Sequence, residues 1–181
     1  MTTPPRRSTN YHPACEAAVN HQIHLELYVI YVYKSMASYF EKNMSLKYVG
    51  QFLLRQSALL KEHVEGLIRL QNQRSGQNRQ YDGNINRPDY NYWDSSLKAM
   101  EHALNLAINV NQNLLSIRQL AVDKKDARLA DFLEDSTLQS QVKSIEELRD
   151  HLSTFPMYPR NPEDSLTENL LDKLSLDDKK K

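Results

Sequence analysis

The spacing of the prolines is the feature that most constrains how this chain can fold. The 181 residues include seven prolines, at positions 4, 5, 13, 88, 156, 159 and 162, so two long tracts, 14–87 and 89–155, contain none. Because proline breaks the interior of an α-helix, these positions indicate helix boundaries. Each tract is long enough for two helices, with a break predicted near residues 41–45 in the first tract and 121–127 in the second.

Within both tracts, apolar residues recur at steps of three and four, which is the pattern of an amphipathic helix. Four apolar stripes can be traced, over residues 19–40, 46–70, 93–114 and 138–152. Stripes this narrow suit helices that pack at about 20° in a left-handed bundle. The sequence therefore predicts an all-α fold, a four-helix bundle in which the polar, turn-rich segment 74–92 crosses from the second helix to the third.

The same reading divides the chain into five parts. We expect an N-terminal arm over residues 1–12, the bundle over 13–155 and a linker over 156–164. A short amphipathic fifth helix follows over 165–176, and a charged tail over 177–181. Pro156 and Pro159 predict that the fourth helix ends before them.

Composition excludes several classes of function. Lys plus Arg and Asp plus Glu both number 23, so the net charge is zero and nothing indicates a nucleic-acid surface or a basic membrane patch. The sequence contains no apolar run of about 18 residues that could span a membrane, and its first residues do not resemble a signal peptide. A single cysteine, Cys15, fits a reducing compartment. We expect an intracellular protein, with the cytoplasm favoured; the sequence does not distinguish cytoplasm from nucleus.

Five polar residues interrupt the apolar stripes: Glu26, Tyr33, Gln56, His63 and Gln141. A buried carboxylate is costly unless it meets a metal, a cation or a proton, so Glu26 is either a metal ligand or a core acid bonded to Tyr33, His63 or the backbone. Taken singly, the other four are ordinary satisfied core residues. Residues 60–63 read Leu-Lys-Glu-His, whereas a dinuclear carboxylate site built in a helical bundle uses Glu-x-x-His. Glu62 points about 100° away from His63 and cannot replace the missing glutamate.

Several segments, in one order along the chain, resemble animal ferritin heavy chains. They are QIHLELY (22–28), YVYKSM (31–36), EHVEGLIRLQNQR (62–74), NVNQNLL (109–115), DARLADFLED (126–135) and QVKSIEELRDH (141–151). The resemblance covers residues 10 to 176 and implies a subunit of a hollow 24-subunit shell that stores ferric oxide. The chain looks like a divergent, heavy-chain-like paralogue of that family.

The resemblance also implies which residues would form a ferroxidase centre for two iron ions. Glu26, Tyr33, His63 and Gln141 match the pattern of the family. The bridging glutamate of the second helix is replaced by Leu60, and the glutamate of the third helix by Ala107. Neither replacement offers an oxygen or nitrogen donor to iron(II). We therefore expect at most a weak single-ion site at Glu26 and His63, and no catalytic residues that function.

Three further surfaces carry over from the family. Asp131 and Glu134 match carboxylates of the three-fold channel, where Arg118 and Ala130 replace the usual His and Cys. Glu62 and Glu65 match the inner face that nucleates mineral, with Leu59 in place of a third carboxylate. Leu166, Leu170 and Leu174 match the lining of the four-fold pore. The segment 74–92 is more polar than is usual in the family, which weakens its expected contact with a two-fold mate.

These observations support one main hypothesis and two alternatives. The main hypothesis is a shell subunit for iron storage with little or no ferroxidase activity, alone or in mixed shells with other ferritin chains; residual iron(II) oxidation is compatible with it. The first alternative is an active ferroxidase with substitute ligands such as Glu62 or Glu101. The second is a shell or interaction protein without an iron role.

Overall fold

A computed structural model describes residues 10–42, 46–81, 93 and 95–155. Three long helices come first: α1 (Pro13–Glu41), α2 (Lys47–Ser75) and α3 (Ser96–Asp123). The fourth helix of the bundle is continuous in three parts, α4 (Ala127–Leu133), a π-helical turn η2 (Glu134–Leu138) and α5 (Gln139–Ser153). The described residues include no β-strand, and none of their helices combines the length and apolarity that a bilayer crossing requires.

The helix ends follow the local sequence. Pro13 begins α1, where its missing N–H costs nothing, and the His12 side chain accepts a hydrogen bond from the Ala14 N–H at 3.0 Å. Ser95 caps α3 by accepting from the Lys98 N–H at 3.1 Å. Gly76 ends α2 in the left-handed conformation, with φ of 71°, which glycine adopts without steric cost.

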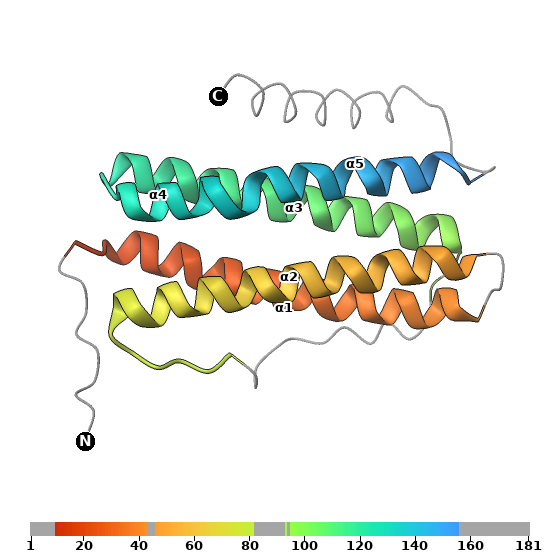
Figure 1. Ribbon diagram of the computed structural model, residues 1–181, viewed down its shortest axis with the longest axis horizontal. Coiled ribbons are helices and arrows are strands. Elements are labelled where there is room, and N and C mark those ends of the chain that lie inside the picture. The colour runs from red at the N-terminus through yellow and green to blue at the C-terminus, as the bar shows by residue number, and fades with distance from the viewer. Residues whose placement is uncertain (1–9, 43–45, 82–92, 94, 156–181) are drawn as a thin grey trace.

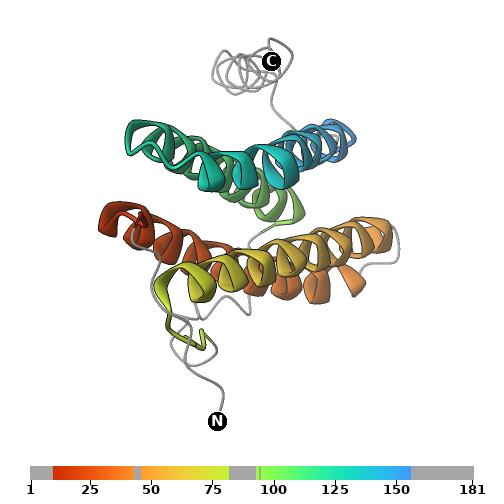
Figure 2. The same cartoon turned by 60° about the vertical axis from the view of Figure 1, so that its left-hand side comes forward.

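The helices form two layers (Figures 1 and 2). α1 packs along α2 in one layer, while α3 packs against α4, η2 and α5 in the other, and α1 contacts α3 between the layers. α1 and α2 approach closely at Gly50, where an added Cβ would lie 3.2 Å from the Ala37 carbonyl oxygen. The core between the layers is largely apolar and is built from the four predicted stripes, together with Leu129 and Leu133 of α4.

The π-helical turn η2 explains the phase of the fourth helix. Leu129 and Leu133 are buried on α4, and Ile145, Leu148 and Leu152 are buried on α5. At 100° per residue, Leu133 and Ile145 would lie about 120° apart on a regular α-helix, but only about 20° apart once one residue is looped out. The extra residue of the π-turn therefore joins two out-of-phase apolar segments into one buried face.

The predicted all-α bundle is confirmed, but some helices begin or end at residues other than those predicted. The breaks lie at 42–46 and 124–126, close to the predicted positions, and α5 ends at Ser153, ahead of Pro156. The prediction that the crossing segment starts at residue 74 was wrong, since α2 continues to Ser75 and buries Arg74. The third helix starts at Ser96, three residues after the first position of its predicted stripe, and the fourth starts at Ala127, next to the predicted break and ahead of the stripe traced from 138. Of the arm predicted over 1–12, residues 1–9 lie outside the described residues, but Tyr11 is buried, so this end of the arm packs on the bundle. The predicted linker, fifth helix and tail also lie outside the described residues.

Candidate metal centre

Glu26 lies at the centre of the bundle and is fully buried, with 0% of its surface exposed. Its Oε1 bonds to the Nδ1 of His63 on α2, and its Oε2 accepts a hydrogen bond from the Gln22 Nε2 at 3.0 Å. Gln22, one helical turn before Glu26, also approaches the Val110 carbonyl of α3 at 3.4 Å. The carboxylate thus has protein partners on both oxygens.

His63 is the hydrogen-bond partner of Glu26 on α2. An ionised carboxylate only accepts hydrogen bonds, so the bond assigns a ring proton to the Nδ1 of His63. The His63 side chain is 9% exposed. Its Nε2 is buried, with no hydrogen-bond partner among the described residues.

A cavity of about 390 Å³ lies beside this pair, between α2 and the fourth helix. It brings together five of the six positions predicted for the remnant centre: Tyr33, Leu60, His63, Ala107 and Gln141. Glu26 is not among its lining residues and lies behind His63. Leu60 and Ala107 are buried, at 5% and 3% exposure. The two positions that would supply carboxylates in a dinuclear site therefore contribute apolar surface to this cavity.

The remaining polar residues of the cavity offer few donors suited to a metal. Tyr33 donates its hydroxyl proton to the Ala103 carbonyl at 3.3 Å, and burial raises its pKa well above the ordinary value for tyrosine. Gln56 and Gln141 are buried amides in the lining. The exposed Glu62 also lines the cavity, whereas Glu101 does not. Among the residues that the structure describes, no three His, Cys, Asp or Glu side chains converge as a set able to hold a metal ion.

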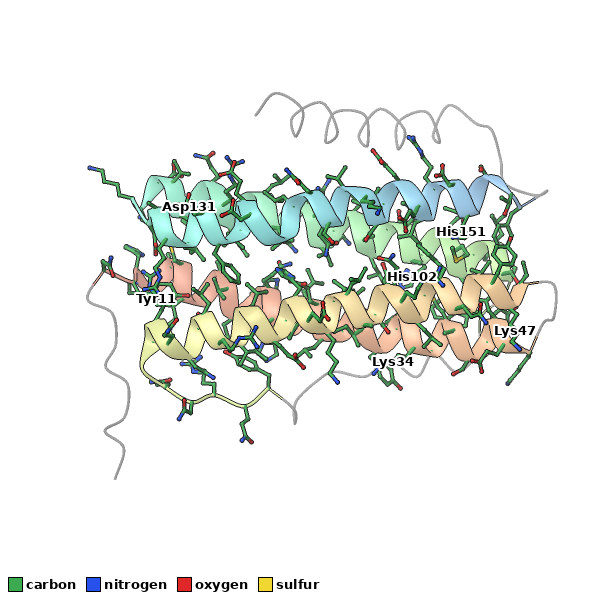
Figure 3. The ribbon with its side chains drawn as sticks, viewed as in Figure 1. Tyr11, Lys34, Lys47, His102, Asp131 and His151 are labelled. Atoms are coloured by element: carbon green, nitrogen blue, oxygen red, sulfur yellow. The ribbon has the colours of Figure 1, made fainter. Side chains whose placement is uncertain are left out.

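Asp131, a predicted channel residue, lies at the far end of the fourth helix from His151, at the end of the bundle that also carries Tyr11 (Figure 3). Asp131 on α4 is exposed, and Ala130 is buried. Arg118 of α3 donates from Nη2 to the Glu134 Oε1 at 3.0 Å, and the Glu134 side chain is 39% exposed. One of the two predicted channel carboxylates is therefore paired with an arginine of its own chain.

The predicted nucleation residues Glu62 and Glu65 are both exposed on α2. Leu59, which stands where the family has a third carboxylate, is 49% exposed. This surface thus alternates acidic and apolar side chains. The predicted pore residues Leu166, Leu170 and Leu174 lie outside the described part of the chain.

A second buried polar cluster was not predicted from the sequence. Arg74, 2% exposed, forms two hydrogen bonds to Asp126, at 3.0 and 2.9 Å. The Asp126 Oδ1 also caps α4 by accepting from the Leu129 N–H at 3.1 Å. The ring of Tyr11 lies 4.5 Å from the Arg74 guanidinium, and its hydroxyl bonds to Gln71. The spacing Leu67, Leu70, Arg74 was the available signal, because it continues the stripe of α2 by one turn.

The comparison with protein families agrees with the bundle. A family model described as the ferritin-like domain matches residues 16–158, from the first turn of α1 to beyond the end of α5. The match covers most of the chain and all four helices that frame the cavity. The chain therefore belongs to the ferritin family.

Proposed function

We propose that this chain is a ferritin-shell subunit that takes part in iron storage and has little or no ferroxidase activity of its own. The observation that carries the proposal is the bond between Glu26 and His63. These are the two nitrogen or carboxylate donors that remain from the pattern of the family, and the Nδ1 of His63 bonds to the Oε1 of Glu26. With Leu60 and Ala107 beside them, the residues present do not fit a pair of iron ions.

The exterior of the bundle supports a reduced role in handling iron as well. Exposed carboxylates at Asp131, Glu62 and Glu65 would attract cations. The pairing of Glu134 with Arg118 removes part of that attraction. Iron stored by a shell of such subunits would then be oxidised slowly, or by other ferritin chains in mixed shells.

The test is to restore the two carboxylates. In the double variant Leu60→Glu plus Ala107→Glu, we expect the rate of iron(II) oxidation to rise well above that of the parent chain. The rate is measured as oxygen consumption by a shell that contains only this variant. Burying two more acids should also lower the melting temperature of the iron-free protein, because replacing apolar residues by buried charges costs about 1–4 kcal/mol. The matched control is Leu60→Gln plus Ala107→Gln, which has similar side-chain volume but no carboxylate.

Two outcomes would contradict the proposal. Heavy-chain-like oxidation rates in the parent homopolymer would show that substitute ligands work, and a crystal soaked in iron(II) would then contain two ions a few ångströms apart. An assembled shell that retains no iron in cells would favour the alternative without an iron role.

A further inference from the structure

Two adjoining cavities form a continuous groove between α2 and the fourth helix, which we call the α2–α5 groove. The inner cavity, about 390 Å³, is the one beside His63, and the outer cavity is about 780 Å³. Gly66, Arg69 and Phe132 line both and mark their junction. Both volumes lie in the range of about 300–1,000 Å³ that is usual for small-molecule sites.

The inner part of the groove has an apolar patch, beside the polar side chains of Tyr33, His63 and two buried amides that also line it. Leu60 and Ala107 are buried there, and the Phe132 ring lies at the junction, 3.5 Å from where a Cβ on Gly66 would stand. Carboxylates at positions 60 and 107 would make this patch acidic. With leucine and alanine instead, the patch can accept the apolar body of a ligand.

The outer part of the groove is basic. Arg69 and Arg128 both line the outer cavity, and no Asp or Glu is among its lining residues. In the described part of the chain neither arginine forms an ion pair, whereas Arg74 and Arg118 are each paired with an acid. Glu62, an acid of the inner cavity, lies two helical turns from Arg69, about 10 Å along the axis. An anion between the two arginines would therefore be held well away from Glu62.

From this polarity we propose that the α2–α5 groove binds an amphipathic monocarboxylate of medium chain length. The carboxylate lies between Arg69 and Arg128, where guanidinium groups donate charge-assisted hydrogen bonds. The aliphatic chain passes Gly66 and Phe132 and covers Leu60 and Ala107. This site shares Leu60 and Ala107 with the candidate metal centre, but it does not depend on any role in iron storage.

The test uses decanoate as the probe and the full chain, by titration calorimetry in low salt. We expect saturable binding of decanoate, weaker binding of the neutral decanol, and loss of affinity as salt screens the arginines. Arg69→Gln plus Arg128→Gln should weaken decanoate binding by about tenfold, since charge-assisted hydrogen bonds are lost. The matched control is Arg55→Gln. Arg55 is an exposed residue of α2 that lines neither cavity, so the affinity of this variant for decanoate should equal that of the parent chain.

A second pair of variants tests the path of the chain through the junction. Gly66→Leu should block the junction and abolish binding of decanoate, while Gly66→Ala adds only a methyl group at van der Waals distance and should keep part of it. Circular dichroism and melting temperature establish that each variant is folded. Equal affinity for decanoate and decanol, or undiminished binding in the double arginine variant, would overturn the proposal. So would undiminished binding in folded Gly66→Leu.

Discussion

At the scale of single residues, the pair of Glu26 and His63 decides the character of the bundle centre. Glu26 is fully buried and accepts from both His63 and Gln22. A carboxylate in that position is stable because its two partners replace the hydration that it loses. The pair therefore stabilises the fold without a bound cation.

Removing the carboxylate should be costly for stability. In Glu26→Ala, the buried polar groups of His63 and Gln22 lose their acceptor, and we expect a destabilisation of about 2–4 kcal/mol. Chemical denaturation of the iron-free protein measures this effect. Glu62→Ala, on the exposed face of the neighbouring helix, should change stability by less than about 0.5 kcal/mol. Similar effects of the two substitutions would mean that the Glu26 pair contributes nothing.

His151 gives the stability a dependence on pH. It packs against Phe52, with ring centroids 4.3 Å apart, and burial lowers its pKa below the ordinary value for histidine. The unfolded chain then binds more protons than the folded chain, so stability should fall as the pH drops through the ordinary histidine pKa of about 6.5. In His151→Phe, melting temperatures between pH 7.5 and 5.5 should vary less than in the parent. An unchanged pH profile would contradict this assignment.

At the scale of helices, the pair of Arg74 and Asp126 fastens the end of α2 to the start of α4. The two hydrogen bonds between them are buried, and Asp126 also supplies the cap of α4. The cluster thus links local helix capping to the contact between the two layers. Tyr11 covers the guanidinium from the segment that leads into α1.

Breaking this pair should cost far more than breaking an exposed one. Asp126→Ala leaves the Arg74 charge buried and unpaired, and removes the cap, so we expect a loss of about 3–5 kcal/mol. Arg118→Gln breaks the half-exposed pair with Glu134, and we expect a loss of less than about 1 kcal/mol. Urea denaturation of both variants checks the contrast, and equal losses would refute it.

The sequence predicted the helices better than it predicted their boundaries. Proline spacing and the 3–4 periodicity predicted the bundle, because helix interiors exclude proline and must bury one face. The apolar stripe of the fourth helix was traced only from Leu138, because the π-turn shifts the phase of its apolar residues and one constant period does not include Leu129 and Leu133. Arg74 was assigned to a loop because its burial depends on Asp126, which lies 52 residues away.

The sequence predicted which residues would lie near one another in the candidate site, but not which contacts they would make. Tyr33, Leu60, His63, Ala107 and Gln141 do line one cavity. His63 was only one of several possible partners that the sequence offered for Glu26. Periodicity predicts which face of a helix a residue occupies, but not the side-chain rotamers that bring two residues into contact. Gln22, one turn before Glu26, was missed for the same reason.

At the scale of the whole molecule, the proposed lack of ferroxidase activity can be tested in assembled shells. If this chain joins mixed shells, the initial rate of iron(II) oxidation should fall in proportion to its share of subunits, because each copy displaces an active one. Shells assembled at defined ratios with an active ferritin heavy chain measure this dependence. Copies carrying Leu60→Glu and Ala107→Glu should reduce the rate less. If the initial rate of iron(II) oxidation does not depend on the ratio of the two subunits, this chain is not an inactive subunit.

The π-turn η2 has a consequence for the length of the chain. Removing a single residue there would convert the π-turn into regular α-helix and leave Leu133 and Ile145 about 20° apart, so the two apolar segments would stay on one face. Inserting one residue into the regular part of α5 before Ile145 would instead rotate Ile145, Leu148 and Leu152 by about 100° about the axis, away from the core. A deletion of one codon within η2 would thus keep the amphipathicity of the fourth helix, whereas an insertion of one codon would disrupt it.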